Sequence, residues 1–389
     1  MKVILTMKKL NALPQRYKGV VQFIYIALSS SHFFASTTTN AFVTTTTTAH
    51  FPAIQRTLPL FSEATQSSSE ELRDIANRQP PPQNFYELQS DSAKAAQLAI
   101  DDGQKLLEVE FPPLPSNVLE MDDLGAYQVA QANLNLAMEF ARKFANLDTF
   151  KVAILLPDEA EKNIAVENSG GTDKPYPGIT ISSLRSSDPD DKRIFKPEQL
   201  FLNLIGGGSG GLVKPLPNTK MYIIIVASAQ ELPDVEELNI ADPDAIIVFY
   251  NLKLDILRGD LGAPAFPAKD FHDRFLSRVK PVYYLRTRQY SRNTPNPPFM
   301  VNFQGCLFRS YPGEFQTLLD TGDGRAYRRV SGSKIRPPLG SFKEELTQNL
   351  QLEGVIKDEG KFLGFLRTGY KTTTWWEEER VEADDGWRS

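Results

Sequence analysis

Polar side chains follow the predicted β-strands where these strands end, and they are the residues best placed to do chemistry. The candidate ligand pocket comprises Asp158, Glu159, Ser228, Gln230 and Asn251. In open α/β sheets, ligands bind beyond the carboxyl ends of parallel strands, so we expect any pocket to lie there. The acids are suited to act as a general base or as metal ligands, but Asp or Ser at a strand end is equally suited to cap the next helix. The sequence leaves both roles open.

Motifs for nucleotide, nucleophile or metal chemistry are missing or out of place. The glycine cluster at 206–211 follows a predicted helix and precedes prolines, whereas a phosphate loop joins a strand to a helix. No Gly-x-Ser-x-Gly motif accompanies His272, and no metal-ligand spacing occurs. Cys306, the only cysteine, lies in a predicted strand, where a thiol usually packs as a small hydrophobic group. We therefore expect no cofactor and no metal, and the sequence reveals no reaction.

A stretch of positive charge offers a second kind of candidate site. Between Lys280 and Lys343, eleven Lys and Arg face three acids, although the whole chain has a net charge of −5. The candidate basic surface comprises Arg286, Arg288, Arg292, Arg325, Arg328, Arg329, Lys334 and Arg336. Such a surface suits anionic lipid or acidic protein, while charged strand edges that prevent aggregation would look the same. The acidic total argues against nucleic acid as a partner.

Alternating helix and strand patterns predict the scaffold that carries these residues. Continuous apolar runs at 221–229 and 245–250 are typical of strands covered on both faces, and a further buried strand is predicted at 151–156. Helical patterns such as 122–146 separate the strands. We therefore predict an α/β domain of three layers, with a mostly parallel sheet between helices on both faces. After Pro281, short polar turns replace the helices, which predicts antiparallel hairpins in the C-terminal part.

The N-terminus has the composition of a targeting leader. Six basic residues and no acid precede Glu63, and an apolar run at 19–28 leads to a small-residue site before Phe42. This order predicts a signal peptide over 1–41, and the acid-free, threonine-rich stretch after it predicts a transit-like segment over 42–70. Together they resemble the bipartite presequence of algae with complex plastids, which implies import into the plastid. A secreted protein with a Thr-rich start is the alternative, but the single cysteine and the lack of any Asn-x-Ser/Thr site argue against it.

A linker, one domain and a tail follow the leader. Residues 71–83 are polar and include three successive prolines, which favours an extended linker. A single α/β domain is then expected over 84–350. The tail over 351–389 is acidic and contains all three tryptophans. Its charge predicts low order, and aromatic residues flanked by acids leave a docking motif as the alternative.

Three short motifs resemble one known family. They are 107–113 (LEVEFPP), 311–316 (YPGEFQ) and 336–338 (RPP) ahead of the last predicted helix. They are similar to the cyanobacterial and plastid domain of unknown function found in Low Photosystem II Accumulation proteins and fused behind some plastid adenylate kinases. Phe315 stands where a tryptophan is expected in that family. The resemblance implies an auxiliary factor in the stroma or on thylakoids, and it carries over no catalytic residue.

Two functions of different classes follow from these patterns. The first is a non-enzymatic plastid factor that supports photosystem II assembly or accumulation by contacting photosystem II subunits or the thylakoid membrane surface. The second is a nucleotide- or phosphometabolite-binding α/β enzyme with its site at the carboxyl ends of the parallel strands, suggested by fold analogy alone. We expect no transmembrane span in the mature chain, since the run at 19–28 is shorter than the roughly 20 apolar residues that a span needs.

Overall fold

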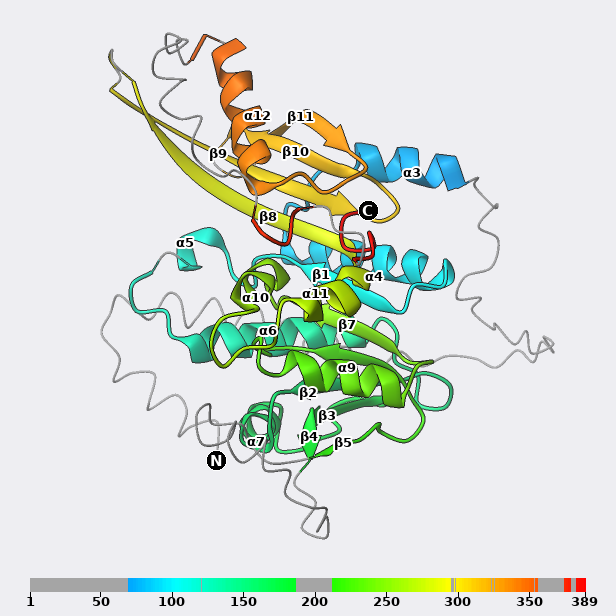
Figure 1. Ribbon diagram of the computed structural model, residues 1–389. Helices are drawn as coiled ribbons and strands as arrows, with labels where there is room; N and C mark the ends of the chain where they lie inside the picture. The colour runs from blue at the N-terminus through cyan, green and yellow to red at the C-terminus, as the bar shows by residue number, and fades with distance from the viewer. Residues whose placement is uncertain are drawn as a thin grey trace, which may run out of the picture. The chain divides into compact units, whose positions relative to one another are not determined.

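A nine-stranded mixed sheet runs through the computed structural model of the chain (Figure 1). In order across the sheet, its strands are β11 (Tyr327–Ser333), β10 (Phe315–Asp320), β9 (Met300–Ser310), β8 (Lys280–Asn293), β1 (Leu106–Glu110), β7 (Ile246–Tyr250), β6 (Thr219–Ile224), β2 (Lys151–Leu156) and β3 (Ile179–Ser183). Neighbours from β8 to β3 pair in parallel, whereas β8 to β11 pair antiparallel. The α/β class, the mostly parallel sheet and the C-terminal antiparallel hairpins are therefore confirmed.

Several segments named above fall outside the part of the chain that the structure describes. The described residues are 69–119, 121–186, 212–294, 297, 299–322, 324, 326–352, 354–355, 374–378 and 383–389. The predicted signal peptide, nearly all of the transit-like segment, the glycine cluster at 206–211 and Arg325 lie outside them. Of the helices described, none has the length and apolar character that a membrane-spanning helix requires.

Helices pack on both faces of the sheet (Figure 1). The helices α4 (Phe85–Asp101), α6 (Ala126–Ala141) and α7 (Glu159–Asn168) bury their apolar side chains in one core cluster. On the opposite face, α9 (Leu232–Ala241), α10 (Leu254–Asp260) and α11 (Asp270–Arg274) form a second cluster. Successive strand residues alternate between the two clusters, as Val152 and Ala153 do, which explains why the parallel strands read as unbroken apolar runs.

A third core cluster lies under the antiparallel half of the sheet. Helix α12 (Leu339–Leu352) contributes Phe342 and Leu346, which pack with Phe303 and Leu307 of β9. The remaining elements are α3 (Ser69–Arg78), α5 (Ser116–Leu119), the 3-10 helix η2 (Leu276–Arg278), and a separate pair of short strands, β4 (Arg185–Ser186) and β5 (Leu212–Val213). A helix, α12, therefore also covers the antiparallel part of the sheet.

Two predicted element boundaries differ from the structure. The strand expected over 221–229 ends at Ile224, because the backbone turns through a left-handed conformation at Val226, with φ 64°. The helix expected from 122 begins at Ala126. The side chain of Gln128, and not an Asp, satisfies the free backbone N–H of Gly125 there, at 2.5 Å.

The predicted extended linker over 71–83 is helical in its first part. Helix α3 holds the turn between β9 and β10: Asn77 Oδ1 accepts a hydrogen bond from the backbone N–H of Glu314 at 2.8 Å. Gln316 Nε2 donates to the carbonyl oxygen of Ala76 at 3.4 Å, and Ala76 itself is buried. Helix α3 therefore packs on the domain although it precedes residue 84.

Two described stretches of the acidic tail, 374–378 and 383–389, pack into the domain, whereas the charge of the tail predicts low order. Trp376 and Trp387 are each 3% exposed, with ring centroids 5.2 Å apart. Both rings lie against the guanidinium of Arg258, at 5.7 and 5.4 Å from its carbon. The backbone N–H of Trp387 also donates to the carbonyl of Ser277 at 2.9 Å. Burial of the two indoles outweighs the repulsion among the acids.

We expect the substitution Trp387→Ala to lower the free energy of unfolding by about 3–5 kcal/mol, the usual cost of truncating a buried tryptophan. Urea denaturation of the full chain measures this change. Tyr86→Ala is the matched control, since this ring is 80% exposed, and we expect it to alter the free energy by no more than about 0.5 kcal/mol. Equal effects of the two substitutions would contradict the packing of the tail.

Candidate functional site

The acids at the carboxyl end of β2 serve the helix that follows it. Asp158 Oδ1 accepts a hydrogen bond from the backbone N–H of Glu161 at 2.9 Å, which makes Asp158 the N-cap of α7. Glu159 accepts from Ser183 Oγ at 2.7 Å and forms an ion pair with Lys162 at 3.1 Å. The sequence leaves two roles open for Asp158, and these hydrogen bonds show the capping role.

The candidate residues after β6 and β7 also have local partners. The backbone N–H of Gln230 donates to Ser228 Oγ at 3.2 Å, and that hydroxyl donates to Glu231. Asn251 is buried: its Oδ1 accepts from the backbone N–H of Phe111 at 2.9 Å, and its Nδ2 donates to Asn133 at 3.1 Å. Among the described residues, the bond between Gln230 and Ser228 is the one hydrogen bond that joins two of the five candidates. A ligand pocket at this edge stays a prediction.

The backbone at this edge is strained. Val226, Asn251 and Lys253 all have left-handed conformations, with φ of 64°, 54° and 53°. A β-branched residue such as Val226 seldom adopts this conformation, and strained residues of this kind cluster at functional sites. The strain therefore lies at the edge where the sequence places its candidate pocket.

A group of buried charges at the end of β1 is a site that sequence reasoning missed. We call it the buried ion cluster, and it comprises Glu108, Asp255, Arg258, Arg286 and Arg336. Asp255, from α10, is its centre. One carboxylate oxygen accepts from Arg258 Nη1 at 3.2 Å; the other accepts from the hydroxyl of Tyr284 at 3.0 Å and from both Arg286 and Arg336. Four donors therefore converge on this one carboxylate, three of them on the same oxygen.

The electrostatics of the buried ion cluster differ for its two acids. Burial alone would raise the pKa of Asp255, but Arg336, Arg258 and Arg286 together lower it. Burial raises the pKa of Glu108, and the arginines only partly oppose this effect, since the nearest guanidinium nitrogens stand 3.7 and 3.9 Å from its carboxylate. Asp255 is therefore the anion that balances the arginines.

Burial and the charge of Glu108 raise the pKa of the neighbouring Glu110 from its ordinary value of 4.5 to about 7. Its Oε2 accepts a hydrogen bond from the backbone N–H of Lys253 at 2.9 Å. This acid therefore takes up or releases its proton near neutral pH, while it holds the strained turn after β7.

Two members of the predicted basic surface belong to the interior. Arg336 is buried and Arg286 nearly so, because both reach inward to Asp255. The prediction of a surface position for these two arginines is wrong, because their guanidinium groups balance buried carboxylates. The signal was present: Glu108 and Glu110 interrupt an otherwise apolar strand, and acids in a buried strand require buried partners.

Most of the other predicted basic residues line the antiparallel half. Arg329 forms an ion pair with Glu314 and donates to the carbonyl of Asn77 at 2.8 Å, and Arg328 donates to Asn349 at 2.6 Å. Lys334 is exposed, whereas Arg288 and Arg292 are half-buried along β8. The structure thus divides the predicted surface into an interior part, a paired part and a part on one hairpin.

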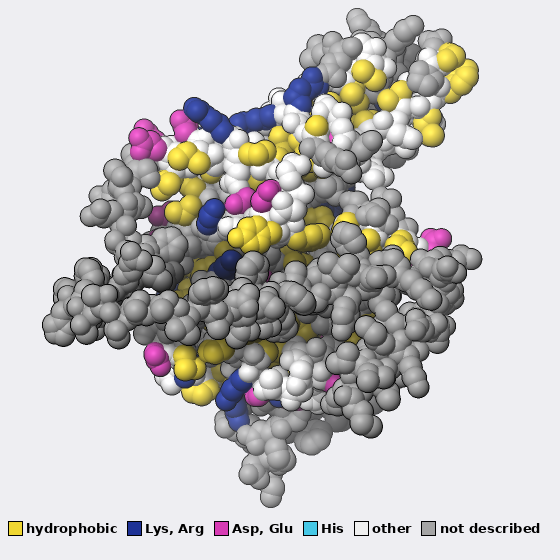
Figure 2. All heavy atoms as spheres, turned by 180° about the vertical axis from the view of Figure 1, so that it is seen from behind, with side chains coloured by type: hydrophobic (Ala, Val, Ile, Leu, Met, Phe, Trp, Pro, Cys, Tyr) yellow, Lys and Arg dark blue, Asp and Glu magenta, His cyan; other side chains and the backbone are white. Residues whose placement is uncertain are grey.

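That hairpin projects past the rest of the sheet. The last residue of β8 that pairs with β1 is Tyr284. The first residue of β9 that pairs with β10 is Gly305. Beyond these points, 289–293 and 300–304 pair with each other alone, and we call this two-stranded ribbon the β8–β9 arm. Near its turn Phe299 is 67% exposed and Met300 55% exposed. Figure 2 shows hydrophobic side chains gathered on the upper right lobe, where the arm and α12 lie, with Lys and Arg side chains beside it.

The remaining reactive side chains form no catalytic centre in the described part of the chain. Cys306 is buried in β9, and burial raises the pKa of its thiol, which keeps it protonated and unreactive. His272 is buried among the tail aromatics, with its ring centroid 5.6 Å from that of Trp387. Across the described residues, no three His, Cys, Asp or Glu side chains are grouped to hold a metal ion.

Comparisons with known proteins give a family and little more. A family described as a domain of unknown function, DUF1995, matches residues 82–344. No curated protein matches the chain. Among solved structures, biliverdin reductase from Synechocystis sp. PCC 6803, in complex with biliverdin and NADP+, aligns with 10% identity and a TM-score of 0.13, over 55% of this chain and 93% of that one.

The titration of Glu110 predicts how the stability of the protein depends on pH. The unfolded chain releases this proton near pH 4.5 and the folded chain near pH 7, so the folded state loses stability as pH rises through that window. Glu110→Gln keeps an acceptor for Lys253 without a charge. Above pH 7 we expect this variant to be more stable than the wild type, by up to about 3 kcal/mol.

Urea unfolding of both proteins across this pH range measures the difference. The two should have similar stability below pH 4.5 and diverge above it. Curves that run parallel throughout would show that folding leaves the pKa of Glu110 at its ordinary value.

Proposed function

We propose, from the premise that the chain belongs to the DUF1995 family, that it is a non-enzymatic factor whose β8–β9 arm docks on an anionic membrane surface. We place it in the plastid, in the stroma or on thylakoids, where it supports photosystem II assembly or accumulation. Photosystem II subunits are the alternative partner. The observation that carries the proposal is the arm itself, which combines positive charge with an exposed apolar tip.

The charge of the arm is one-sided. From Arg274 to Gly313 the chain has no Asp or Glu; the arm carries Arg292, and Arg288 lies directly before it. Each Lys or Arg near an anionic leaflet contributes about 1 kcal/mol of attraction. Exposed Phe299 and Met300 add apolar surface that can enter the boundary between headgroups and acyl chains. This combination is typical of peripheral membrane proteins rather than of a nucleic-acid reader.

The cellular part of the proposal has separate support. The acid-free leader has the order of a signal peptide followed by a transit-like segment. The motifs at 107–113, 311–316 and 336–338 resemble those of proteins implicated in photosystem II accumulation. Neither line of support depends on the arm.

The alternative function, an enzyme that binds a nucleotide or phosphometabolite at the strand ends, has less support. Asp158 caps a helix, Asn251 bonds to the backbone just after β1, and Ser228 bonds to Glu231. Only the strained backbone at Val226 and Asn251 favours a functional role for this edge. The alternative stays a prediction.

We expect the full chain to bind vesicles of phosphatidylcholine with phosphatidylglycerol, and to bind them less tightly as salt is added. Replacing Phe299 and Met300 together by Ser should weaken binding about tenfold, through lost apolar burial. Ile240→Ser is the control, because Ile240 is 71% exposed on α9, outside the arm. Any affinity of the leader itself is the same in all three proteins.

Cosedimentation measures this binding. Equal binding by the arm variant and the control would rule out docking through the arm. Capture of photosystem II subunits in place of vesicles, with the same dependence on Phe299 and Met300, would assign the arm to a protein partner.

In cells, a fluorescent fusion to residues 1–70 should enter the plastid, and disruption of the gene should lower the amount of assembled photosystem II. Fluorescence microscopy and native gels of thylakoid membranes measure the two effects. A secreted or cytosolic fusion, or normal photosystem II in the disrupted strain, would refute the cellular part of the proposal.

A further inference from the structure

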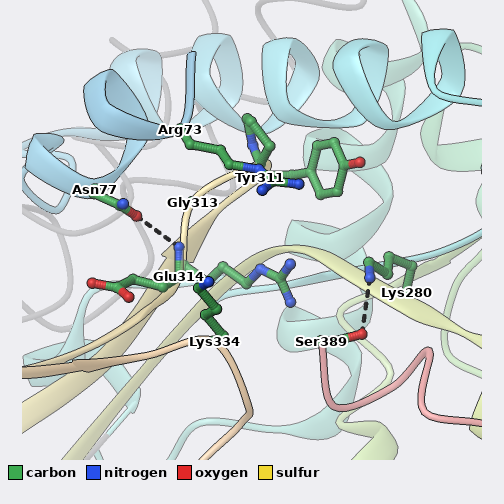
Figure 3. A pocket seen from close by; sticks show the side chains of 10 residues that line it. Arg73, Asn77, Lys280, Tyr311, Gly313, Glu314, Lys334 and Ser389 are labelled. Carbon is green, nitrogen blue, oxygen red and sulfur yellow. Dashed lines mark hydrogen bonds between the residues drawn. The ribbon is translucent and has the colours of Figure 1, made fainter. Parts of the chain in front are cut away.

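A pocket of about 310 Å³ lies at the start of β8, and positively charged side chains dominate its lining (Figure 3). The cationic residues come from four separate segments: Arg73 from α3, Lys280 from β8, Arg309 from the end of β9, and Lys334 from the turn after β11. Since Lys280 opens β8 beside Leu107 near the start of β1, the pocket lies at the amino ends of these parallel strands. That is the edge opposite the one where the sequence places its candidate residues.

Arg309 is the most unusual member of this lining. It is 4% exposed, yet its Nε and Nη1 atoms have no hydrogen-bond partner. Its closest neighbours are aromatic, with the guanidinium carbon 4.8 Å from the ring centroid of Phe315 and 6.0 Å from that of Tyr311. Burial lowers the pKa of Arg309 to about 10, so it remains charged at neutral pH. A buried, unpaired cation is costly unless an anion compensates it.

Lys280 reflects the same excess of positive charge. Burial, followed by the nearby charge of Arg309, lowers its pKa to about 8, and Asp384 only partly offsets this. Its ammonium group donates to Ser389 Oγ at 3.1 Å, a neutral acceptor. In the unliganded protein, repulsion between these two cations is therefore felt at neutral pH.

The acid that lines the pocket does not neutralise it. Glu314 forms its ion pair with Arg329, and Figure 3 shows its carboxylate directed away from Lys280. In the same view Arg73 reaches in from α3 toward Tyr311, while Lys280 approaches from the far side with Ser389. The pocket thus gathers cations from several directions around a space with an aromatic wall.

We propose that this pocket binds the phosphate group of a small phosphate monoester. Four cations exceed what one carboxylate would need, whereas a phosphate monoester carries about two negative charges at neutral pH. The planar forks of Arg73 and Arg309 match phosphate oxygens, and the lysines supply point charges. The volume lies at the lower end of small-molecule sites, about 300–1,000 Å³, and Tyr311 offers a face for the organic part.

The test is calorimetric titration of the full chain with inorganic phosphate and with glycerol 3-phosphate. We expect saturable binding of both, tighter for the monoester. Arg309→Gln and Arg73→Gln should each weaken binding at least about tenfold, as expected when a charge-assisted hydrogen bond is lost. Arg78→Gln is the matched control, since Arg78 is exposed on the same helix as Arg73 but outside the pocket lining.

A second measurement separates a binding role of Arg309 from a structural one. Because its charge is buried and unpaired, Arg309→Gln should raise the Tm of the unliganded protein while it weakens binding. A lower Tm in this variant would show that Arg309 stabilises the fold and would overturn its assignment to a ligand.

Two further results would overturn the proposal. One is the absence of saturable binding by the wild type to both probes, or equal binding by the wild type and the Arg309→Gln and Arg73→Gln variants. The other is tighter binding to a phosphoserine peptide or to phosphatidate vesicles than to glycerol 3-phosphate, with the same dependence on Arg309. That result would place the phosphate on a macromolecule. The site is separate from Phe299 and Met300, so either proposal can fail without the other.

Discussion

The constraint on which this structure depends is the need to balance charges that have been removed from water. Asp255 accepts hydrogen bonds from three arginines and Tyr284, and these donors come from α10, from β8 and from the segment before α12. Removing charges from water is costly, and the cost is recovered only when every partner is in place. Arg258 in turn lies against Trp376 and Trp387, which joins the tail to the same arrangement. The buried ion cluster thus connects the parallel half of the sheet, the hairpin half and the tail.

The architecture was predictable from the sequence because apolar patterning determines it. The mostly apolar segment 151–156 and the unbroken apolar run at 245–250 correspond to β2 and β7, and the polar turns after Pro281 correspond to antiparallel pairing. Errors arose where long-range contacts override local composition. Helix α3 is polar, yet its hydrogen bonds to the turn after β9 hold it on the domain. The charge of the tail predicts low order. Composition cannot show that the tail indoles pack against the buried guanidinium of Arg258.

The site was less predictable than the fold. The polar residues at the strand ends correctly predicted that Asp158 and Asn251 lie at the carboxyl edge of the sheet. The side-chain oxygen of each, however, accepts a hydrogen bond from a backbone N–H. The positive charge of the region after Lys280 indicated a basic surface there. Charge alone could not distinguish Arg336, which is buried, from Lys334, which is exposed. Arg309 had a signal in the sequence, since it ends the apolar run of β9. The motifs that carry the family resemblance now have physical roles: Glu108 and Arg336 meet in the buried ion cluster, and 311–316 forms the turn beside the Arg309 pocket.

The position of β1 in the sheet has a consequence for the order in which the protein can assemble. Its neighbours are β7 and β8, so residues 106–110 pair with residues 247–250 and 280–284. Contacts of such large sequence separation give a fold high contact order, and chains of this kind fold slowly. During vectorial synthesis or translocation from the N-terminus, β1 emerges long before either neighbour, and its unpaired backbone edges and apolar side chains stay exposed meanwhile. A nascent chain of this topology is therefore a natural client for chaperones that shield unpaired strands until the middle of the sheet can close.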